Sequence, residues 1–174
     1  MYLIVKTPQK DNIEPEIKEE KKARYEITQV DLFTIKDFHS SELSVMGVML
    51  GDSFDDVLNT LGIPDIQQDF PPNIRNIEYS KRIDLNDTGL ILQFTDRILT
   101  KITIREPFNK YLIGETQINH SKAEIYKIFG IPDDMQFIPI KAGSFIVFRN
   151  NIYKDYGLEI YIRANEQFGF GLVS

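Results

Sequence analysis

Two stretches of the sequence share one pattern: SFDDVLNTLGIPD at residues 53–65 and SKAEIYKIFGIPD at residues 121–133. They align without a gap at an offset of 68 residues. The same offset pairs GLILQF at residues 89–94 with GLEIYI at residues 157–162, and it still matches apolar residues beyond residue 170. A register kept over so many positions indicates an internal repeat.

Each stretch carries the signals of a short helix with a defined start and end. Ser53 and Ser121 are suited to the N-cap, and Asp56 and Glu124 stand three positions on, where a capping-box partner belongs. In the Gly-Ile-Pro run that follows, glycine suits the left-handed residue after a helix, and proline prevents continuation. We therefore expect two helices of about two to three turns each.

Alternating apolar residues predict three strands after each helix, and short strands before it. The expected strands cover residues 48–50, 77–82, 89–95 and 98–105 in the first half and 111–118, 144–149, 157–163 and 168–173 in the second. Turn residues between neighbouring strands indicate antiparallel hairpins. The predicted fold class is α+β: a tandem duplication of a unit made of one helix and an antiparallel sheet of three to four strands, with both helices on one face of the sheet.

This pattern also predicts how the chain is divided. Residues 1–24 are rich in charge and are expected to form a flexible tether. Residues 25–110 are expected to hold an N-terminal extension and the first repeat, and residues 111–174 the second repeat, both within one compact domain.

Composition excludes several classes of function. The 174 residues carry a net charge of −6, which argues against a nucleic-acid surface. No cysteine is present, so disulfides, thiol nucleophiles and thiolate metal sites are excluded. The longest apolar run, at residues 45–50, is far shorter than the roughly 20 residues that cross a bilayer. We therefore expect membrane attachment only through an anchor upstream of residue 1.

A short apolar strand followed by GDSxxDVxxxLGxPD at residues 51–65 resembles the repeat of the β-lactamase-inhibitor-protein-like fold. It is also similar to the single copy in SmpA/OmlA outer-membrane lipoproteins, although the tandem arrangement over residues 45–174 is closer to the inhibitor proteins. The second copy departs from the pattern, with INH at residues 118–120 in place of LGD, and the disulfides of the inhibitors have no counterpart here. The resemblance implies a cell-envelope or secreted protein that acts by protein–protein contact; a cytoplasmic protein is the alternative.

No residue pattern predicts catalysis or metal binding. Asp52, Asp55 and Asp56 would offer carboxylate oxygens to a divalent cation, but their spacing does not match a calcium loop, and acids complement a helix N-terminus. His39 and His120 have no sequence partner that marks a nucleophile or an orienting group. We expect no cofactor and no enzyme activity. The alternative is a small-ligand carrier or hydrolase with a pocket between the two repeats.

The sheet face away from the helices is the predicted binding surface. Strand alternation places Tyr161 and Arg163 there, and the repeat register adds Ile146 and Phe148. Exposed aromatic and apolar side chains beside one arginine are typical of protein-binding surfaces. We therefore predict that these four residues bind another protein, unless residues 32–38 cover Ile146 and Phe148. A homo-oligomer formed through the same face is a further possibility.

Two tyrosines form a second candidate contact. Tyr153 and Tyr156 fall in a predicted hairpin at residues 149–156, where exposed rings would insert into a partner's cleft. The alternative is that both rings stack on the edge of the sheet.

Overall fold

Strands dominate the structure, a computed structural model that describes residues 23–30, 34–35, 37–82, 85–105, 120–139, 147–163 and 166–174. The predicted tether therefore lies almost entirely outside the described residues, as does the predicted strand at residues 111–118.

One antiparallel sheet of eight strands forms the main layer, in the order β4-β5-β6-β7-β11-β10-β9-β8. Its first half consists of β4 (Ile66–Phe70), β5 (Ile74–Arg82), β6 (Leu85–Thr95) and β7 (Ile98–Arg105). Its second half consists of β8 (Asp134–Pro139), β9 (Val147–Tyr153), β10 (Leu158–Arg163) and β11 (Glu166–Val173). Within each half, successive strands are neighbours.

The predicted fold class is wrong, because the chain does not form repeated units that each have a small sheet. Strand β7 pairs with β11 in an antiparallel ladder in which Lys101 faces Val173 and Arg105 faces Gly169. The same main-chain pairing that joins hairpin neighbours therefore joins the two halves, and the result is a single large sheet in a molecule that is mostly strand. In this ladder Thr103 lies opposite Gly171, its partner at the 68-residue offset.

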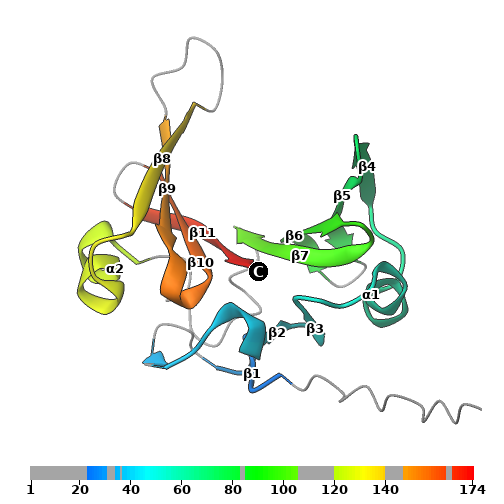
Figure 1. Ribbon diagram of the computed structural model, residues 1–174, viewed down its shortest axis with the longest axis horizontal. Coiled ribbons are helices and arrows are strands. Elements are labelled where there is room, and N and C mark those ends of the chain that lie inside the picture. Colours follow the sequence, from blue (N-terminus) through cyan, green and yellow to red (C-terminus); the bar gives the residue numbers. More distant parts are fainter. Residues whose placement is uncertain are drawn as a thin grey trace, which may run out of the picture.

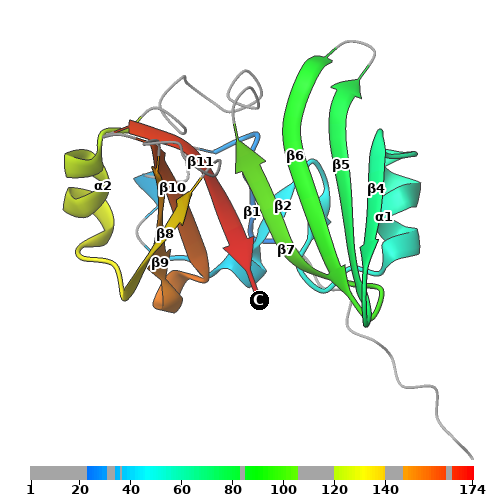
Figure 2. The ribbon, with the colours of Figure 1, turned by 90° about the horizontal axis from the view of Figure 1, so that it is seen from above.

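The remaining elements lie on one side of this sheet. They are the helices α1 (Phe54–Leu61) and α2 (Lys122–Phe129), the short 3-10 helices η2 (Ser40–Glu42) and η5 (Lys154–Tyr156), and a three-stranded sheet of β1 (Tyr25–Glu26), β2 (Leu43–Val45) and β3 (Val48–Met49). Figure 1 shows the large sheet bent into a trough, with α1, α2 and the small sheet outside it. Figure 2 looks onto the inside of the trough, over which no described helix or strand lies.

Both helices begin and end as their sequences predict. The Ser53 hydroxyl accepts the Asp56 N–H at 3.1 Å, and the Ser121 hydroxyl accepts the Glu124 N–H at 3.3 Å. Glu124 also reaches back to the Ser121 N–H at 2.8 Å and completes a capping box. The shorter Asp56 side chain reaches only the Ser53 hydroxyl. The glycines that follow the helices have φ of 81° and 80°, a conformation that side chains with a Cβ rarely adopt.

One apolar core lies between the large sheet and the elements outside the trough. The sheet contributes alternate residues, such as Leu90 and Leu92 of β6 and Ile160 of β10, all at most 1% exposed. Val57 of α1 and Ile125 of α2 are completely buried against them. Burial of every second strand residue on this side leaves the intervening residues on the trough side of the sheet.

Within the small sheet, Glu26 joins β1 to the hairpin of β2 and β3. Its carboxylate accepts the main-chain N–H groups of Met46 at 2.8 Å and Gly47 at 3.0 Å, and the hydroxyl of Ser44 at 2.8 Å. Burial raises the pKa of this carboxyl, but the hydrogen bonds outweigh burial and hold the pKa below its ordinary value. The charged form of Glu26 is therefore the one that the fold stabilises.

Candidate functional site

The candidate site is the side of the eight-stranded sheet that lines the trough, here called the open face. The described side chains on this face alternate with the buried core residues and include Asn76, Glu78, Ile91, Gln93, Lys101, Thr103, Glu159 and Tyr161. Tyr161 therefore lies on the predicted face. Arg163 and Phe148 are opposite each other in the β9–β10 ladder, two positions from Tyr161 along β10. Their side chains, and Ile146 altogether, lie outside what the structure describes.

Three polar side chains form a cluster at the centre of the open face. The Lys101 Nζ lies 2.6 Å from the Glu159 Oε2, and the Tyr161 hydroxyl donates to the same oxygen at 2.8 Å. The Lys101 ammonium also lies 5.9 Å from the centroid of the Tyr161 ring. With side chains of Lys101 and Glu159 only 26% and 13% exposed, this ion pair is partly desolvated. Each charge in the cluster has its partner within the cluster.

Two glycines of β11 make room for the Tyr161 ring. Tyr161 is opposite Gly169 in the β10–β11 ladder, and a Cβ on Gly171 would stand 2.8 Å from the Tyr161 hydroxyl oxygen. Both glycines are buried. The ring therefore lies across the main chain of β11, and its hydroxyl is held beside Glu159.

The surroundings of Tyr161 keep its hydroxyl protonated. Burial, and after it the negative charge and hydrogen bond of Glu159, raise the pKa of the Tyr161 hydroxyl well above its ordinary value, against a smaller opposite effect of Thr103. A tyrosine in this state donates a hydrogen bond but does not act as a base near neutral pH. The cluster is thus suited to rigid contact rather than to proton transfer.

The second predicted contact lies in the core. Tyr153 is only 3% exposed, and its ring lies 5.4 Å from that of Phe129. Tyr156 is partly buried, with its ring 5.3 Å from Phe129 and 5.2 Å from Phe38. The two tyrosines join α2 to the segment before η2, so Tyr153 is not available to a partner and Tyr156 is available only in part.

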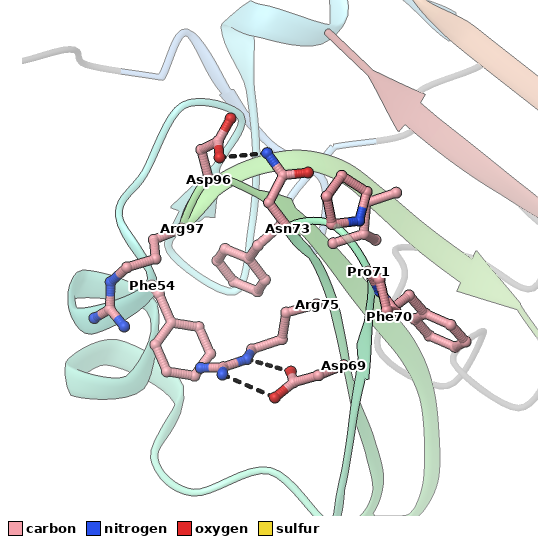
Figure 3. A pocket seen from close by; sticks show the side chains of 11 residues that line it. Phe54, Asp69, Phe70, Pro71, Asn73, Arg75, Asp96 and Arg97 are labelled. Atoms are coloured by element: carbon pink, nitrogen blue, oxygen red, sulfur yellow. Dashed lines mark hydrogen bonds and ion pairs between the residues drawn. The ribbon is translucent and has the colours of Figure 1, made fainter.

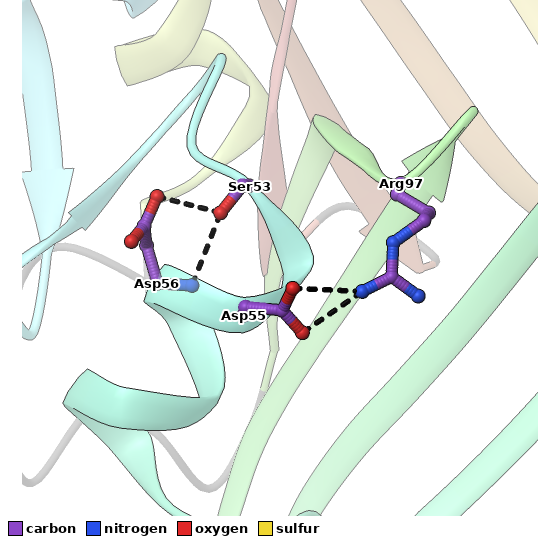
Figure 4. A network of polar contacts seen from close by, with 4 residues as sticks. All are labelled: Ser53, Asp55, Asp56 and Arg97. Carbon is purple, nitrogen blue, oxygen red and sulfur yellow. Dashed lines mark hydrogen bonds and ion pairs between the residues drawn. The ribbon is translucent and has the colours of Figure 1, made fainter.

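The acidic residues around the start of α1 are engaged with protein groups (Figure 4). One terminal nitrogen of Arg97 donates to both carboxylate oxygens of Asp55, at 2.8 and 2.9 Å. Asp56 accepts the Ser53 hydroxyl, and Asp52 accepts the Met49 N–H at 2.8 Å. Within the described ranges, no group of three or more His, Cys, Asp or Glu side chains is arranged to hold a metal ion.

A cavity of about 630 Å³ lies at the far end of the first half of the sheet, and the sequence did not predict it. The ring of Phe54 lines the cavity and packs edge-on against the ring of Phe94, with 5.1 Å between the ring centroids. The guanidinium carbons of Arg75 and Arg97 lie 4.8 and 5.3 Å from the centroid of the Phe54 ring. Asp69 binds Arg75 through two hydrogen bonds of 2.6 and 3.0 Å (Figure 3). These residues come from three separate segments of the chain, so no local motif marks the cavity.

The turn beside this cavity contains two non-glycine residues with positive φ. Asp96 and Arg97 have φ of 50° and 65°, and they form the two-residue connection between β6 and β7 that the sequence predicted. Asp96 accepts a hydrogen bond from Asn73, and Arg97 binds Asp55. Side-chain contacts therefore hold both residues of the turn.

Comparison with known proteins identifies no family. No family model and no curated protein matches the chain. Two solved structures are similar: a cysteine-rich secretory protein from Staphylococcus aureus, with a TM-score of 0.46 and 11% identity, and an extracellular protein containing an SCP domain from Bacillus anthracis, with 0.43 and 8%. Each match covers 72% of this chain and 44% of the other, so the chain spans less than half the length of either protein.

The predicted resemblance to β-lactamase-inhibitor proteins and SmpA/OmlA lipoproteins is wrong. The two similar structures are described as a cysteine-rich secretory protein and an SCP-domain protein, and neither belongs to those families. The shared helix-start and Gly-x-Pro signals are structural devices that recur in unrelated folds. No helix in the described part of the chain is long and apolar enough to cross a membrane.

Proposed function

We propose that the chain is a non-enzymatic protein-binding module that acts in the cell envelope or the secreted space and contacts its partner through the open face. The observation that supports this function is the Lys101–Glu159–Tyr161 cluster, which occupies the middle of a sheet face that no described helix or strand covers. The two structures with similar folds are described as secretory and extracellular, and the proposed location agrees with theirs.

The physical state of the cluster favours protein binding. A partner that covers the open face buries charges that are already paired, so it removes water from an ion pair and not from an isolated ion. The Tyr161 ring is fixed by Glu159 and by the glycines beneath it, so little side-chain entropy is lost on contact. A rigid aromatic side chain with a polar tip is a common anchor in protein interfaces.

Photocrosslinking tests this function on the intact chain. A benzoylphenylalanine at position 93 would project from the open face, whereas the same residue at position 59, on the exposed side of α1, would project away from it. In cells that produce the chain, we expect a discrete crosslinked protein from position 93 and none from position 59. Ile91→Asp, which adds a charge to the open face, should abolish the adduct.

Two controls decide the outcome. Asn59→Asp is a matched added charge on α1 and should leave the adduct at position 93 unchanged. Cooperative thermal unfolding of the Ile91→Asp variant separates lost binding from lost folding. Equal crosslinking from positions 59 and 93, or none from either, would contradict the proposed function.

The cavity beside Phe54 favours a small-ligand carrier as the second candidate. Its walls include Phe70, Pro71 and Ile74, and its carboxylates at Asp69 and Asp96 already bind Arg75 and Asn73, which suits a carrier better than a hydrolase. If the chain is a carrier, the fluorescent probe anilinonaphthalene sulfonate binds the folded protein at one site, and Ile74→Trp, which fills the cavity, removes that binding. Binding that is unchanged by Ile74→Trp would exclude this cavity.

A further inference from the structure

Strand β4 has one edge that no described strand occupies. It is the first strand of the eight-stranded sheet, it pairs with β5 alone among the described strands, and it forms one rim of the trough (Figure 1). The Asp65 N–H donates to the Glu78 C=O at 3.0 Å, so this carbonyl points to β4, and Ile66, opposite Glu78, directs its main-chain groups to β5. Alternation then turns the main-chain groups of Gln67 and Asp69 to the free edge, where they are open to a further strand.

The sequence of β4 does not protect this edge. Natural edge strands usually carry a lysine, a proline or a bulge, or lie beneath a covering element. Strand β4 reads IQQDF, its ladder with β5 has no bulge, and all of its side chains are exposed. The opposite edge of the sheet differs, because the Met135 N–H of β8 donates to Asp134 at 2.8 Å and is not open to a second strand. Of the two edges, β4 is therefore the one that can pair with another chain.

We propose that β4 is a dimerisation edge and that its partner is β4 of a second copy of this chain. The argument is self-complementarity in an antiparallel pair centred on Gln68. Ile66 and Phe70 are 43% and 46% exposed, and in this pair Ile66 of each copy lies opposite Phe70 of the other, so apolar surface is buried twice. On the other side of the strand, Gln67 of each copy lies opposite Asp69, where its amide N–H meets a carboxylate acceptor.

The charges of β4 do not oppose this pairing. Its one charged residue is Asp69, which accepts from Arg75 at 2.6 and 3.0 Å, so each carboxylate is compensated within its own copy. Because Asp69 lies opposite Gln67, the two carboxylates of the dimer stand diagonally, about 7–8 Å apart. All other pairs across the edge join neutral side chains. The contact is made by the rim and not by the open face, so it does not depend on the proposed function.

Sedimentation velocity from about 1 µM to about 1 mM tests the dimer. A single edge pair is a small interface, so we expect a reversible monomer–dimer equilibrium. Gln68→Lys places two ammonium groups opposite each other at the twofold axis and should weaken association about tenfold or more. The matched variant is Gln136→Lys, the same change at the 68-residue offset on β8, and it should leave association unchanged. Both glutamines are exposed, so both variants should keep a cooperative thermal transition.

A disulfide reports the register. The chain has no cysteine, so Gln68→Cys introduces a single thiol. The proposed pairing places this thiol opposite its own copy, with the two Cα atoms about 4.5 Å apart and within the range of a disulfide. Gln136→Cys is the matched thiol on β8. Rapid oxidation of Gln68→Cys alone to a covalent dimer supports the proposal.

Four results would overturn the β4 dimer. They are a chain that stays monomeric up to about 1 mM, association weakened equally by Gln68→Lys and Gln136→Lys, and equal oxidation of the two cysteine variants. The fourth is a dimer that Ile91→Asp abolishes and Gln68→Lys leaves intact, because the contact between copies would then lie on the open face.

Discussion

Replacement of Gly171 by alanine tests the packing at the centre of the open face. The new Cβ would stand 2.8 Å from the Tyr161 hydroxyl oxygen, with the Lys101 Cε at 3.5 Å. Ordinary contact requires about 3.5 Å, so the hydroxyl must move by about 0.7 Å. It now lies 2.8 Å from Glu159, and such a movement either breaks or compresses that hydrogen bond.

The expected loss of stability follows from two opposing terms. A hydrogen bond to a charged acceptor contributes about 1.5–3 kcal/mol. Gly171 has no positive φ, so alanine fits its backbone and stabilises the fold by about 0.4–1 kcal/mol through the unfolded state. Gly171→Ala should therefore lower the free energy of unfolding by about 1–2 kcal/mol. Urea unfolding measures it, with the m-value unchanged.

A double-mutant cycle isolates the cause. Tyr161→Phe removes the oxygen that the new Cβ would meet, so in that background Gly171→Ala should be neutral or stabilising. A change of sign between the two backgrounds is the expected signature. An equal loss in both, or no loss in either, would show that the Tyr161 hydroxyl does not lie across β11 as described.

Three other substitutions test separate contacts. Glu26→Gln should lower the free energy of unfolding by about 1–3 kcal/mol at neutral pH. Because the folded-state pKa of Glu26 is lowered, this difference between variant and wild type is present above the ordinary pKa of 4.5 and is lost as the pH falls through the folded-state pKa. Unfolding measured from pH 7 to pH 3 would show this loss. Ser121→Ala should lower the free energy of unfolding by about 1 kcal/mol through the lost N-cap, measured by urea unfolding. Phe54→Leu keeps an apolar side chain but loses the ring between Arg75 and Arg97, so thermal unfolding should show a loss of about 1–2 kcal/mol that added salt does not remove.

Local signals in the sequence predicted the helices well. A serine at the N-cap, an acid three positions on and a Gly-x-Pro end act within one turn of chain, and both helices occupy the expected residues. The short strands β4 and β8 were not predicted, because their strand structure depends on pairing with a neighbouring strand and not on a local signal. Every side chain of β4 is exposed, and its sequence IQQDF has no apolar alternation, so only its pairing with β5 makes it a strand.

The continuity of the sheet could not be predicted from local pattern. Strands β7 and β11 alternate as expected, but their pairing joins residues near 103 to residues near 171, and no turn connects them. Alternation says which side chains share a face and does not say which strand lies alongside. The prediction of separate small sheets was wrong here because the joint is made by main-chain hydrogen bonds that every strand edge offers.

Strand alternation predicted the face of the sheet on which Tyr161 lies but not the contacts that Tyr161 makes there. Alternation along β10 places Tyr161 and Glu159 on one face, but the Lys101 that pairs with Glu159 is 58 residues away. Tyr153 lies near a turn, where exposure is the ordinary expectation. It is buried because Phe129 of α2 packs on it, a contact that depends on the tertiary fold.

The two halves of the sheet agree where packing constrains them and differ where the cluster lies. On the helix side, positions related by the 68-residue offset are apolar in both halves: Leu90 and Leu158, Leu92 and Ile160, Ile102 and Phe170, Ile104 and Leu172. On the open face the related positions are unlike in kind: Ile91 and Glu159, Gln93 and Tyr161, Lys101 and Gly169, Thr103 and Gly171. The cluster needs this difference, because Tyr161 lies across Gly169 and Gly171, at positions where the first half has Lys101 and Thr103. Core packing alone does not require a paired lysine and glutamate on a face that no described element covers, so the asymmetry of the open face supports the proposed binding role.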